Sequence, residues 1–276
     1  MHRFGKRAEI QPDHRLFQPA SGGRNELVRE GRVVVAEDSQ LADQQRYWGL
    51  LSALADGVNR WGDLEAVLGQ KRGSLQHALA VAIDAGWVER LEDPLRSNRA
   101  MYALTEPIIR FQRLVIEPNQ QRLAARRAAD VWRDIRPIVA AQIQAPHLES
   151  LARDWLVRFA SPETLGGALA LTGSTTLPGD GRGDGAQLDL AATEATARGG
   201  SRVLLIGEVK ATEARVGERE LLRLDEAVRK LGDKVDPKRC KRFLVSKSGF
   251  TTDLERAAAQ RSDVELVDLQ RIYNGN

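Results

Sequence analysis

An acid and a base stand two residues apart at the end of one apolar run. The stretch LLIGEVKAT (204–212) opens with apolar residues and then places Glu208 and Lys210 on either side of Val209. Residues i and i+2 of a strand project from the same face, so the carboxylate and the ammonium group are expected to lie together. A carboxylate binds hard cations, and a lysine stabilises negative charge that grows on a phosphate. A Glu-x-Lys triplet by itself is most often structural at a strand end, so phosphodiester hydrolysis is indicated only if a further acid lies beside Glu208.

Hairpin arithmetic places a second carboxylate beside Glu208. We assume that the runs AQLDLAA (186–192) and RVLLIGEVK (202–210) pair through a turn centred between positions 198 and 199, so that position 189 lies opposite position 208. Position 189 is Asp189, and cross-strand neighbours have Cβ atoms about 4.5–5.5 Å apart. Asp189 and Glu208 can therefore offer oxygens to one cation. A slip of one residue would turn Asp189 to the other face.

The expected cation is magnesium, with manganese as the alternative. Two carboxylates held close together repel each other, so a divalent cation or a lysine is needed to compensate their charge. The sequence has a single cysteine, Cys240, and four scattered histidines, which argues against an intramolecular disulfide and against a zinc site. No G-x-x-x-x-G-K-[ST] motif occurs, so no ATP site of that type is expected.

The periodicity of residues 41–106 predicts a winged helix-turn-helix. Three helical segments (44–57, 61–69 and 73–86) each end near a glycine, and two short alternating runs follow at 87–91 and 100–104. In a winged helix the third helix enters the major groove of DNA and the hairpin loop lies on the backbone. A protein-binding or packing module has the same pattern and remains an alternative.

Polar residues of the third helix and of the hairpin loop are the candidate DNA contacts. These side chains can form hydrogen bonds with DNA, but they do not form a dense basic face. They are Lys71, Arg72, Ser74, Gln76, His77, Arg96 and Arg99. Residues 107–144 are predicted to form a basic helical connector whose charged face is solvated. A phosphate contact by Arg122, Arg126 and Arg127 is the alternative for this segment.

Residues 145–276 alternate helix and strand in an order typical of an α/β sandwich with a mixed sheet. An amphipathic helix at 147–160 is expected to bury Leu148, Leu151, Trp155 and Phe159. Strands follow at 168–176, 186–192 and 202–210, then a helix at 216–232, a strand at 242–247, a helix at 251–260 and a strand at 264–269. The central strands are apolar enough to be covered on both faces. Residues 1–40 lack periodicity and are expected to form an irregular lead-in.

These features together resemble a known nuclease superfamily. An acid on the first helix, an Asp on the second strand and Glu-x-Lys on the third are similar to the PD-(D/E)xK restriction-endonuclease-like pattern. From about residue 46 the chain resembles the C-terminal part of archaeal-type ATPases, with a winged helix, the segment YALTEPIIRFQRLVIEP and a G-E-x-K strand. The resemblance implies that Asp189 and Glu208 bind the metal, that Lys210 is the catalytic lysine and that Glu149 is the first-helix acid that supports the metal.

The sequence departs from these relatives in two places. Many of them carry an acid two residues before the strand Asp, where this chain has Gln187, and the sequence contains no ATPase module. We therefore expect a DNA-binding protein with a magnesium-dependent nuclease-like domain. The alternatives are a non-catalytic remnant that binds DNA or protein, a protein that works with a separate ATPase, and a homodimer that cuts both strands.

Composition is consistent with a globular protein outside the membrane. The 276 residues are 42% hydrophobic and 29% charged, with a net charge of +3, which argues against a disordered or fibrous chain. No apolar run approaches the roughly 18–20 residues of a membrane span, and the N-terminus has no signal-peptide block. We expect a cytoplasmic location and no membrane partner.

Overall fold

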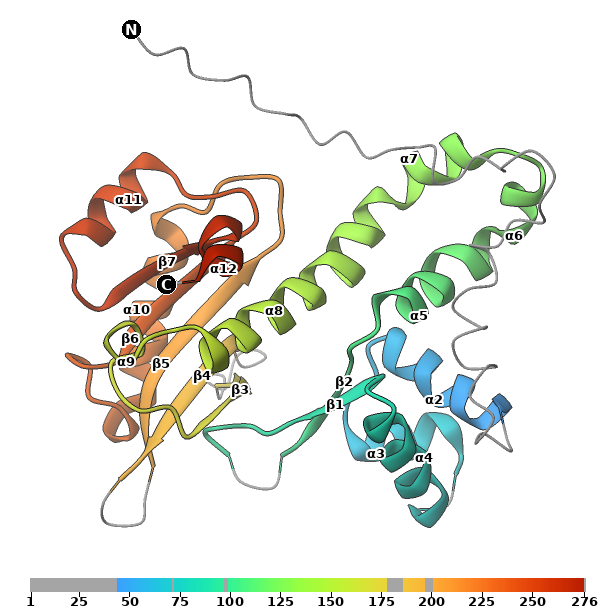
Figure 1. Cartoon of the computed structure of the whole chain (residues 1–276), viewed down its shortest axis with the longest axis horizontal. Helices are drawn as coiled ribbons and strands as arrows, with labels where there is room; N and C mark the ends of the chain where they lie inside the picture. The colour runs from blue at the N-terminus through green and yellow to red at the C-terminus, as the bar shows by residue number, and fades with distance from the viewer. Residues whose placement is uncertain (1–43, 71, 97–98, 178–185, 197–200, 276) are drawn as a thin grey trace, which may run out of the picture.

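The structure is a computed structural model that describes residues 44–70, 72–96, 99–177, 186–196 and 201–275. The lead-in expected at residues 1–40 lies outside the described residues. Figure 1 shows one lobe of helices with a hairpin and a second lobe built on a sheet, connected by two helical arms. The chain is therefore mixed α/β, with five strands in a mixed sheet in the second lobe.

The first lobe packs three helices and a hairpin around one apolar core. The helices are α2 (Gln44–Ala55), α3 (Trp61–Leu68) and α4 (Arg72–Asp84). Each helix contributes a fully buried leucine to the core: Leu50, Leu64 and Leu75. Strands β1 (Val88–Leu91) and β2 (Met101–Leu104) follow as an antiparallel pair. The predicted order of three helices and a hairpin is confirmed.

Two helical arms lead from the first lobe to the second (Figure 1). The outward arm consists of α5 (Pro107–Phe111), the π-helical turn η2 (Gln112–Ile116) and α6 (Glu117–Ala124). The return arm consists of α7 (Ala128–Val139), the π-helical turn η3 (Ala140–Gln144) and α8 (Ala145–Arg158). The arms share a small apolar core that includes Val115, Val131 and Ile135.

Two of the three connector arginines already pair with carboxylates of the connector itself. Arg122 lies 2.6 Å from Asp134, and Arg127 lies 3.1 Å from Asp130. These exposed ion pairs contribute little stability, but they occupy the guanidinium groups. The predicted helical connector is present. The ion pairs of Arg122 and Arg127 favour a solvated charged face over a phosphate contact.

The sheet of the second lobe has the strand order β3-β4-β5-β6-β7. The antiparallel part comprises β3 (Leu171–Thr176), β4 (Gln187–Ala195) and β5 (Ser201–Lys210). Strands β6 (Lys241–Ser246) and β7 (Val264–Asp268) continue it in parallel with β5. The remaining elements are α9 (Pro162–Leu165), α10 (Glu218–Leu231), η4 (Gly232–Lys234), α11 (Thr252–Ala259) and α12 (Leu269–Asn274).

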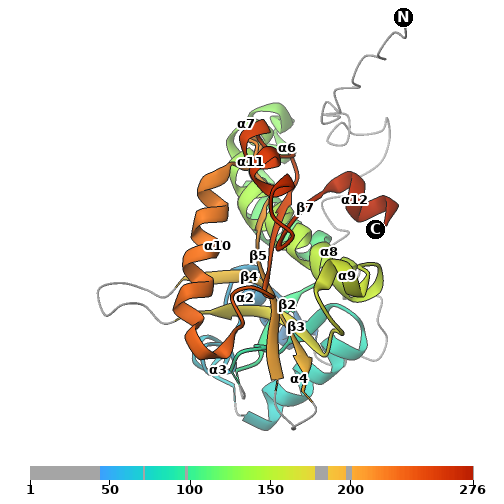
Figure 2. The same ribbon diagram turned by 90° about the vertical axis from the view of Figure 1, so that its left-hand side faces the viewer.

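Helices cover both faces of the sheet, as the apolar central strands require. Figure 2 shows α8 on one side of the strands and α10 on the other. Under α8 the core includes Trp155, Leu205 and Phe243, while Ile206 and Leu244 pack with α10 and α11 on the opposite face. No described helix is both long and apolar enough to cross a bilayer.

The predicted buried stripe of α8 is wrong at two of its four positions, because Leu151 is only half-buried and Phe159 lies beyond the helix end. Phe159 is 57% exposed, because α8 ends at Arg158 and the chain turns there. Ala152 and Leu156 are buried instead, beside the predicted Leu148 and Trp155. The buried residues of α8 therefore follow the spacing i, i+4, i+7 and i+8 from Leu148. This apolar stripe is wider than the predicted one, as expected for a helix packed on a sheet.

The loop between β1 and β2 packs on the edge of the sheet and joins the two lobes. Pro94 is buried, and Leu95 contacts the core cluster that contains Leu177 and Leu188. The backbone approach is close, since a Cβ added at Gly173 of β3 would lie 2.1 Å from the carbonyl oxygen of Glu92. The first half of the loop is therefore held between the lobes.

Gly173→Ala is expected to lower the free energy of unfolding by about 1–3 kcal/mol, because the added methyl group overlaps the loop backbone. Thermal unfolding of the variant and of the wild type measures the effect. Gly73→Ala is the matched control, since a Cβ at Gly73 would have no heavy atom within 4 Å. Equal melting temperatures for the Gly173 variant and the wild type would contradict this packing.

Candidate active site

The candidate site lies where β4 and β5 meet at the end away from their turn. The register pairs Leu190 with Gly207 and Ala191 with Ile206, so the next position along places Asp189 beside Glu208. This is the register that the hairpin arithmetic predicts for this end of the strands. Nearer the turn, a bulge shifts the pairing by one residue from Thr193 onward. The bulge lies on the turn side of Leu190 and leaves the position of Asp189 unchanged.

Hydrogen bonds hold the three polar side chains of the site. The backbone N–H of Val209 donates to Oδ2 of Asp189 at 2.9 Å, which fixes this carboxylate against β5. Nζ of Lys210 donates to Oε2 of Glu208, so the acid and the base lie together as the strand periodicity predicts. Asp189, Glu208 and Lys210 line one pocket of about 490 Å³, together with Arg223 and Glu226 of α10.

Gly207 lets β5 run close to its neighbours immediately before Glu208. A Cβ at this position would lie 2.7 Å from the carbonyl oxygen of Phe243 and 3.3 Å from Cβ of Leu190. Any side chain would therefore push β6 or β4 away from β5. The packing of β5 against β4 and β6 therefore requires glycine at position 207, immediately before Glu208.

Glu149 lies on α8 in a neighbouring cavity, beside Arg110 and Arg153. Gln187 lines both this cavity and the pocket of Asp189, so the two hollows adjoin at this residue. Nη1 of Arg153 is 4.0 Å from Oε2 of Glu149, and Nη2 donates to Glu89 of β1 at 3.0 Å. Arg153 therefore links α8 to the hairpin of the first lobe.

Burial raises the pKa of two carboxylates, Glu149 and Asp189. Burial, then the negative charge of Asp189, raises the pKa of Glu149 to about 7, although Arg153, Lys210 and Arg110 act in the opposite direction. Burial also raises the pKa of Asp189, with a further contribution from Glu208, while the Val209 hydrogen bond opposes the shift. Shifted acids in a hollow are typical of functional sites, but structural networks produce them too.

Three carboxylates line this pocket, namely Asp189 and Glu208 of the strands and Glu226 of α10. Among the residues that the structure describes, no three His, Cys, Asp or Glu side chains gather closely enough to form a metal cluster. Glu149 lines the adjoining cavity instead of the pocket of Asp189 and Glu208. Magnesium commonly uses one or two carboxylates and keeps several waters, so the donor pair Asp189 and Glu208 fits such an ion.

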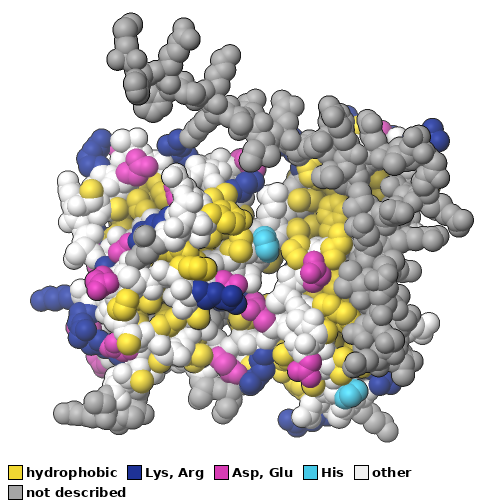
Figure 3. Space-filling model, viewed as in Figure 1, with side chains coloured by type: hydrophobic (Ala, Val, Ile, Leu, Met, Phe, Trp, Pro, Cys, Tyr) yellow, Lys and Arg dark blue, Asp and Glu magenta, His cyan; other side chains and the backbone are white. Residues whose placement is uncertain are grey.

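The candidate DNA contacts fall into two separate groups. On α4, Arg72, Gln76 and His77 are exposed and Ser74 is half-buried, whereas Lys71 lies outside the described residues. The guanidinium carbon of Arg72 lies 6.0 Å from the ring centroid of Trp61. Arg96 and Arg99 instead line a pocket between the hairpin loop and β3. Figure 3 shows basic and acidic side chains interspersed on the visible face, without a continuous basic patch.

Sequence reasoning missed Arg110 and Arg153, which surround Glu149. Arg153 is only 7% exposed, and its Nε has no hydrogen-bond partner in the described part of the chain. A signal was present, because Glu149 and Arg153 are four residues apart on one helix and such pairs meet. The contact of Arg153 with Glu89, 64 positions away, has no local signal.

Comparisons with known proteins do not identify a family. No protein-family model and no curated protein matches the chain. Among solved structures, the protein VC1899 from Vibrio cholerae is similar with a TM-score of 0.31 and 14% sequence identity. The alignment covers 91% of this chain and 55% of that one, so the chain spans about half the length of that protein. A likeness at this level carries no argument about function.

Proposed function

We propose that this protein is a DNA-binding, metal-dependent nuclease that hydrolyses phosphodiester bonds. The observation that carries the proposal is the meeting of Asp189, Glu208 and Lys210 at the ends of two adjoining strands, in one pocket. The order of three helices and a hairpin supports a winged helix-turn-helix in the first lobe. Helices on both faces of a mixed sheet support a restriction-endonuclease-like sandwich in the second.

Each side chain of the site has a role that follows from its position. A magnesium or manganese ion held by Asp189 and Glu208 supplies Lewis-acid polarisation of the phosphodiester when bound. The N–H of Val209 orients Asp189 before the substrate arrives, and this preorganisation favours the transition state. Lys210 places a positive charge beside Glu208, where it stabilises the charge that develops on the phosphate oxygens. Arg223 of α10 lines the same pocket and can orient a neighbouring phosphate.

Glu149 acts from the adjoining cavity through its charge. With a pKa of about 7, it changes protonation near neutral pH and alters the electrostatic field at Asp189. In the proposal Glu149 is the acid of the first helix that supports the metal site of Asp189 and Glu208 from the adjoining cavity.

Lys210→Ala tests the catalytic assignment. Cleavage in the presence of magnesium is expected to slow by about 10²–10³-fold, since a charge aimed at the transition state is lost. Rates on supercoiled, linear and single-stranded DNA, with and without magnesium, measure the effect. Lys238→Ala changes an exposed lysine outside the pocket and is expected to leave the rate unchanged. Wild-type rates in the Lys210 variant would contradict the assignment.

One observation favours a second candidate function. Lys210 pairs directly with Glu208 and the Val209 N–H binds Asp189, so both carboxylates have partners within the chain itself. This suits a non-catalytic remnant of an archaeal-type ATPase that binds DNA or protein, or one that works with a separate ATPase. Calorimetric titration with magnesium separates the two functions, because the nuclease binds the ion and the remnant does not.

A further inference from the structure

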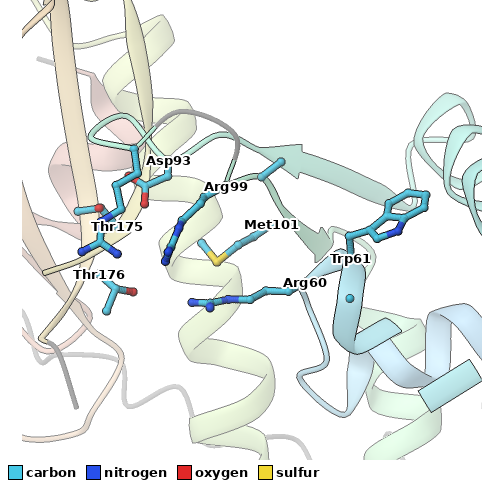
Figure 4. A pocket seen from close by; sticks show the side chains of 10 residues that line it. Arg60, Trp61, Asp93, Arg99, Met101, Thr175 and Thr176 are labelled. Carbon is cyan, nitrogen blue, oxygen red and sulfur yellow. The ribbon is translucent and has the colours of Figure 1, made fainter. Parts of the chain in front are cut away.

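A second pocket lies between the hairpin loop and the edge of the sheet. Its walls come from three distant segments, namely the residues at the start of α3, the loop between β1 and β2, and the end of β3. Figure 4 shows the side chains of Arg60 and Arg99 extending toward Thr175 and Thr176 across this space. None of Asp189, Glu208 and Lys210 lines it, so it is separate from the candidate active site.

The pocket carries an excess of positive charge. Arg60, Arg96 and Arg99 line it with one acid, Asp93. Asp93 is buried, and its Oδ1 accepts the backbone N–H of Leu95 at 2.9 Å, which uses the carboxylate to hold the loop turn. No described carboxylate lies within 4.0 Å of the three guanidinium groups. Three such groups around one hollow repel each other, and a bound anion relieves the repulsion.

An unpartnered hydroxyl at the pocket gives an independent indication of a ligand. Thr175 is 1% exposed and lines the pocket, yet its Oγ1 has no hydrogen-bond partner within the part of the chain that the structure describes. Leaving a buried hydroxyl unsatisfied costs about 1–3 kcal/mol, and native proteins pair nearly all such groups. An anionic oxygen bound in the pocket can accept this hydrogen bond.

The chemistry of the walls selects a phosphate. The planar guanidinium of arginine donates two parallel hydrogen bonds to phosphate oxygens, which makes arginine the usual residue for this recognition. The cavity volume is about 290 Å³, near the lower end of the range for small-molecule sites of roughly 300–1,000 Å³. Met101 points into the space between Arg60 and Arg99 and adds an apolar contact for the uncharged part of a ligand, whereas the ring of Trp61 points away from it (Figure 4). Strand β3 closes one side, which favours a small ligand over a continuous nucleic-acid backbone.

We propose that this pocket binds the phosphate group of a nucleotide-sized phosphate ester. Arg60, Arg96 and Arg99 hold the phosphate oxygens, and Thr175 donates its hydroxyl hydrogen to one of them. Because Thr176 pairs with Gln187, two residues from Asp189, the ligand lies against the strand that neighbours the candidate active site. Binding also ties the hairpin loop to β3, so the ligand stabilises the junction between the lobes.

The test is calorimetric titration of the full chain with inorganic phosphate and with AMP. Wild-type protein is expected to bind both, and Arg60→Ala and Arg99→Ala are each expected to weaken AMP binding at least about 10-fold, since each removes a charge-assisted hydrogen bond. Arg90→Ala is the matched control, because Arg90 is an arginine of the same hairpin that pairs with Glu92 at 2.7 Å and lies outside the pocket. The control is expected to bind AMP with wild-type affinity.

Thr175→Val separates a ligand contact from a structural role. Valine keeps the shape and removes the unpartnered hydroxyl, so the ligand-free variant is expected to melt at the wild-type temperature or above it. AMP binding is expected to weaken about 3- to 10-fold with loss of one hydrogen bond. A melting temperature at or above that of the wild type with unchanged AMP affinity would remove Thr175 from the site.

Two results would overturn the proposal. The first is no binding of either phosphate or AMP by the wild type, or unchanged affinity in the Arg60 and Arg99 variants. The second is loss of binding to a short DNA duplex in these variants, measured by fluorescence anisotropy, without any binding of phosphate or AMP. That second result would assign the arginines to the nucleic-acid backbone. Neither result depends on DNA cleavage, so the pocket is tested separately from the proposed nuclease.

Discussion

Replacing Asp189 with asparagine is expected to reduce magnesium-dependent DNA cleavage at least about 100-fold while the fold remains intact. Asparagine keeps a side-chain oxygen that accepts the Val209 N–H, which Asp189 now binds at 2.9 Å. It removes the negative charge that faces Glu208 and with it half of the charge that attracts the ion. Initial cleavage rates over a range of magnesium concentrations measure the loss, and circular dichroism checks the fold.

Glu226→Gln is the matched control for this experiment. Glu226 lines the same pocket from α10, but its side chain is 53% exposed and pairs with Lys230 at 3.3 Å. Its loss is expected to change the rate less than about two-fold, because an exposed ion pair is weak. Equal losses in the two variants would mean that any negative charge in the pocket suffices, and wild-type rates for Asp189→Asn would exclude Asp189 from catalysis.

Glu149→Gln is expected to stabilise the protein at pH 8 by up to about 3 kcal/mol relative to the wild type. The pKa of Glu149 rises from 4.5 to about 7 in the folded chain. Below pH 4.5 the carboxyl group is protonated in both folded and unfolded states, so it costs no stability. Between pH 4.5 and 7 the unfolded chain releases the proton first, and the wild type loses stability as the pH rises. Above pH 7 the loss is complete, and a neutral glutamine avoids it.

Urea unfolding at pH 5 and pH 8, in the presence of EDTA, measures this difference. At pH 5 the stabilisation is expected to fall below about 1 kcal/mol. Arg153 keeps its contact with Glu89 at 3.0 Å, so the substitution leaves no isolated buried charge. Asp154→Asn, which replaces an exposed acid of the same helix, is the control and should show the same small effect at both pH values. A pH-independent effect of Glu149→Gln would contradict the burial of this carboxyl group.

The element order and the meeting of Asp189 with Glu208 could be predicted because both depend on local signals. Glycines mark the helix ends, and the turn residues between two alternating runs define a hairpin. The assumed turn centre was slightly wrong, since Ala195 pairs with Ser201 and the bulge restores the predicted register beyond it. The apolar run of β5 has no residue that marks such a bulge, so sequence alone could not place it.

The junction between the lobes could not be predicted, because it depends on contacts between residues far apart in the chain. Nothing near Gly173 in the sequence indicates that the carbonyl of Glu92 lies against it. The same holds for the pocket that brings Arg60 and Arg99 to Thr175. Glu149 was expected as a supporting acid on its helix, but its raised pKa depends on burial, which only the packed structure defines.

The most direct measurement of the proposed activity compares wild-type protein with Glu208→Gln in one cleavage assay, with magnesium, with manganese and with EDTA. Glutamine retains an oxygen near Lys210 but removes the charge, so the metal site should fail while the strand remains in place. We predict cleavage by the wild type in either metal, none in EDTA and none by the variant. Equal cleavage by both proteins, or no cleavage of any DNA by the wild type with metal, would contradict a nuclease built on Asp189, Glu208 and Lys210.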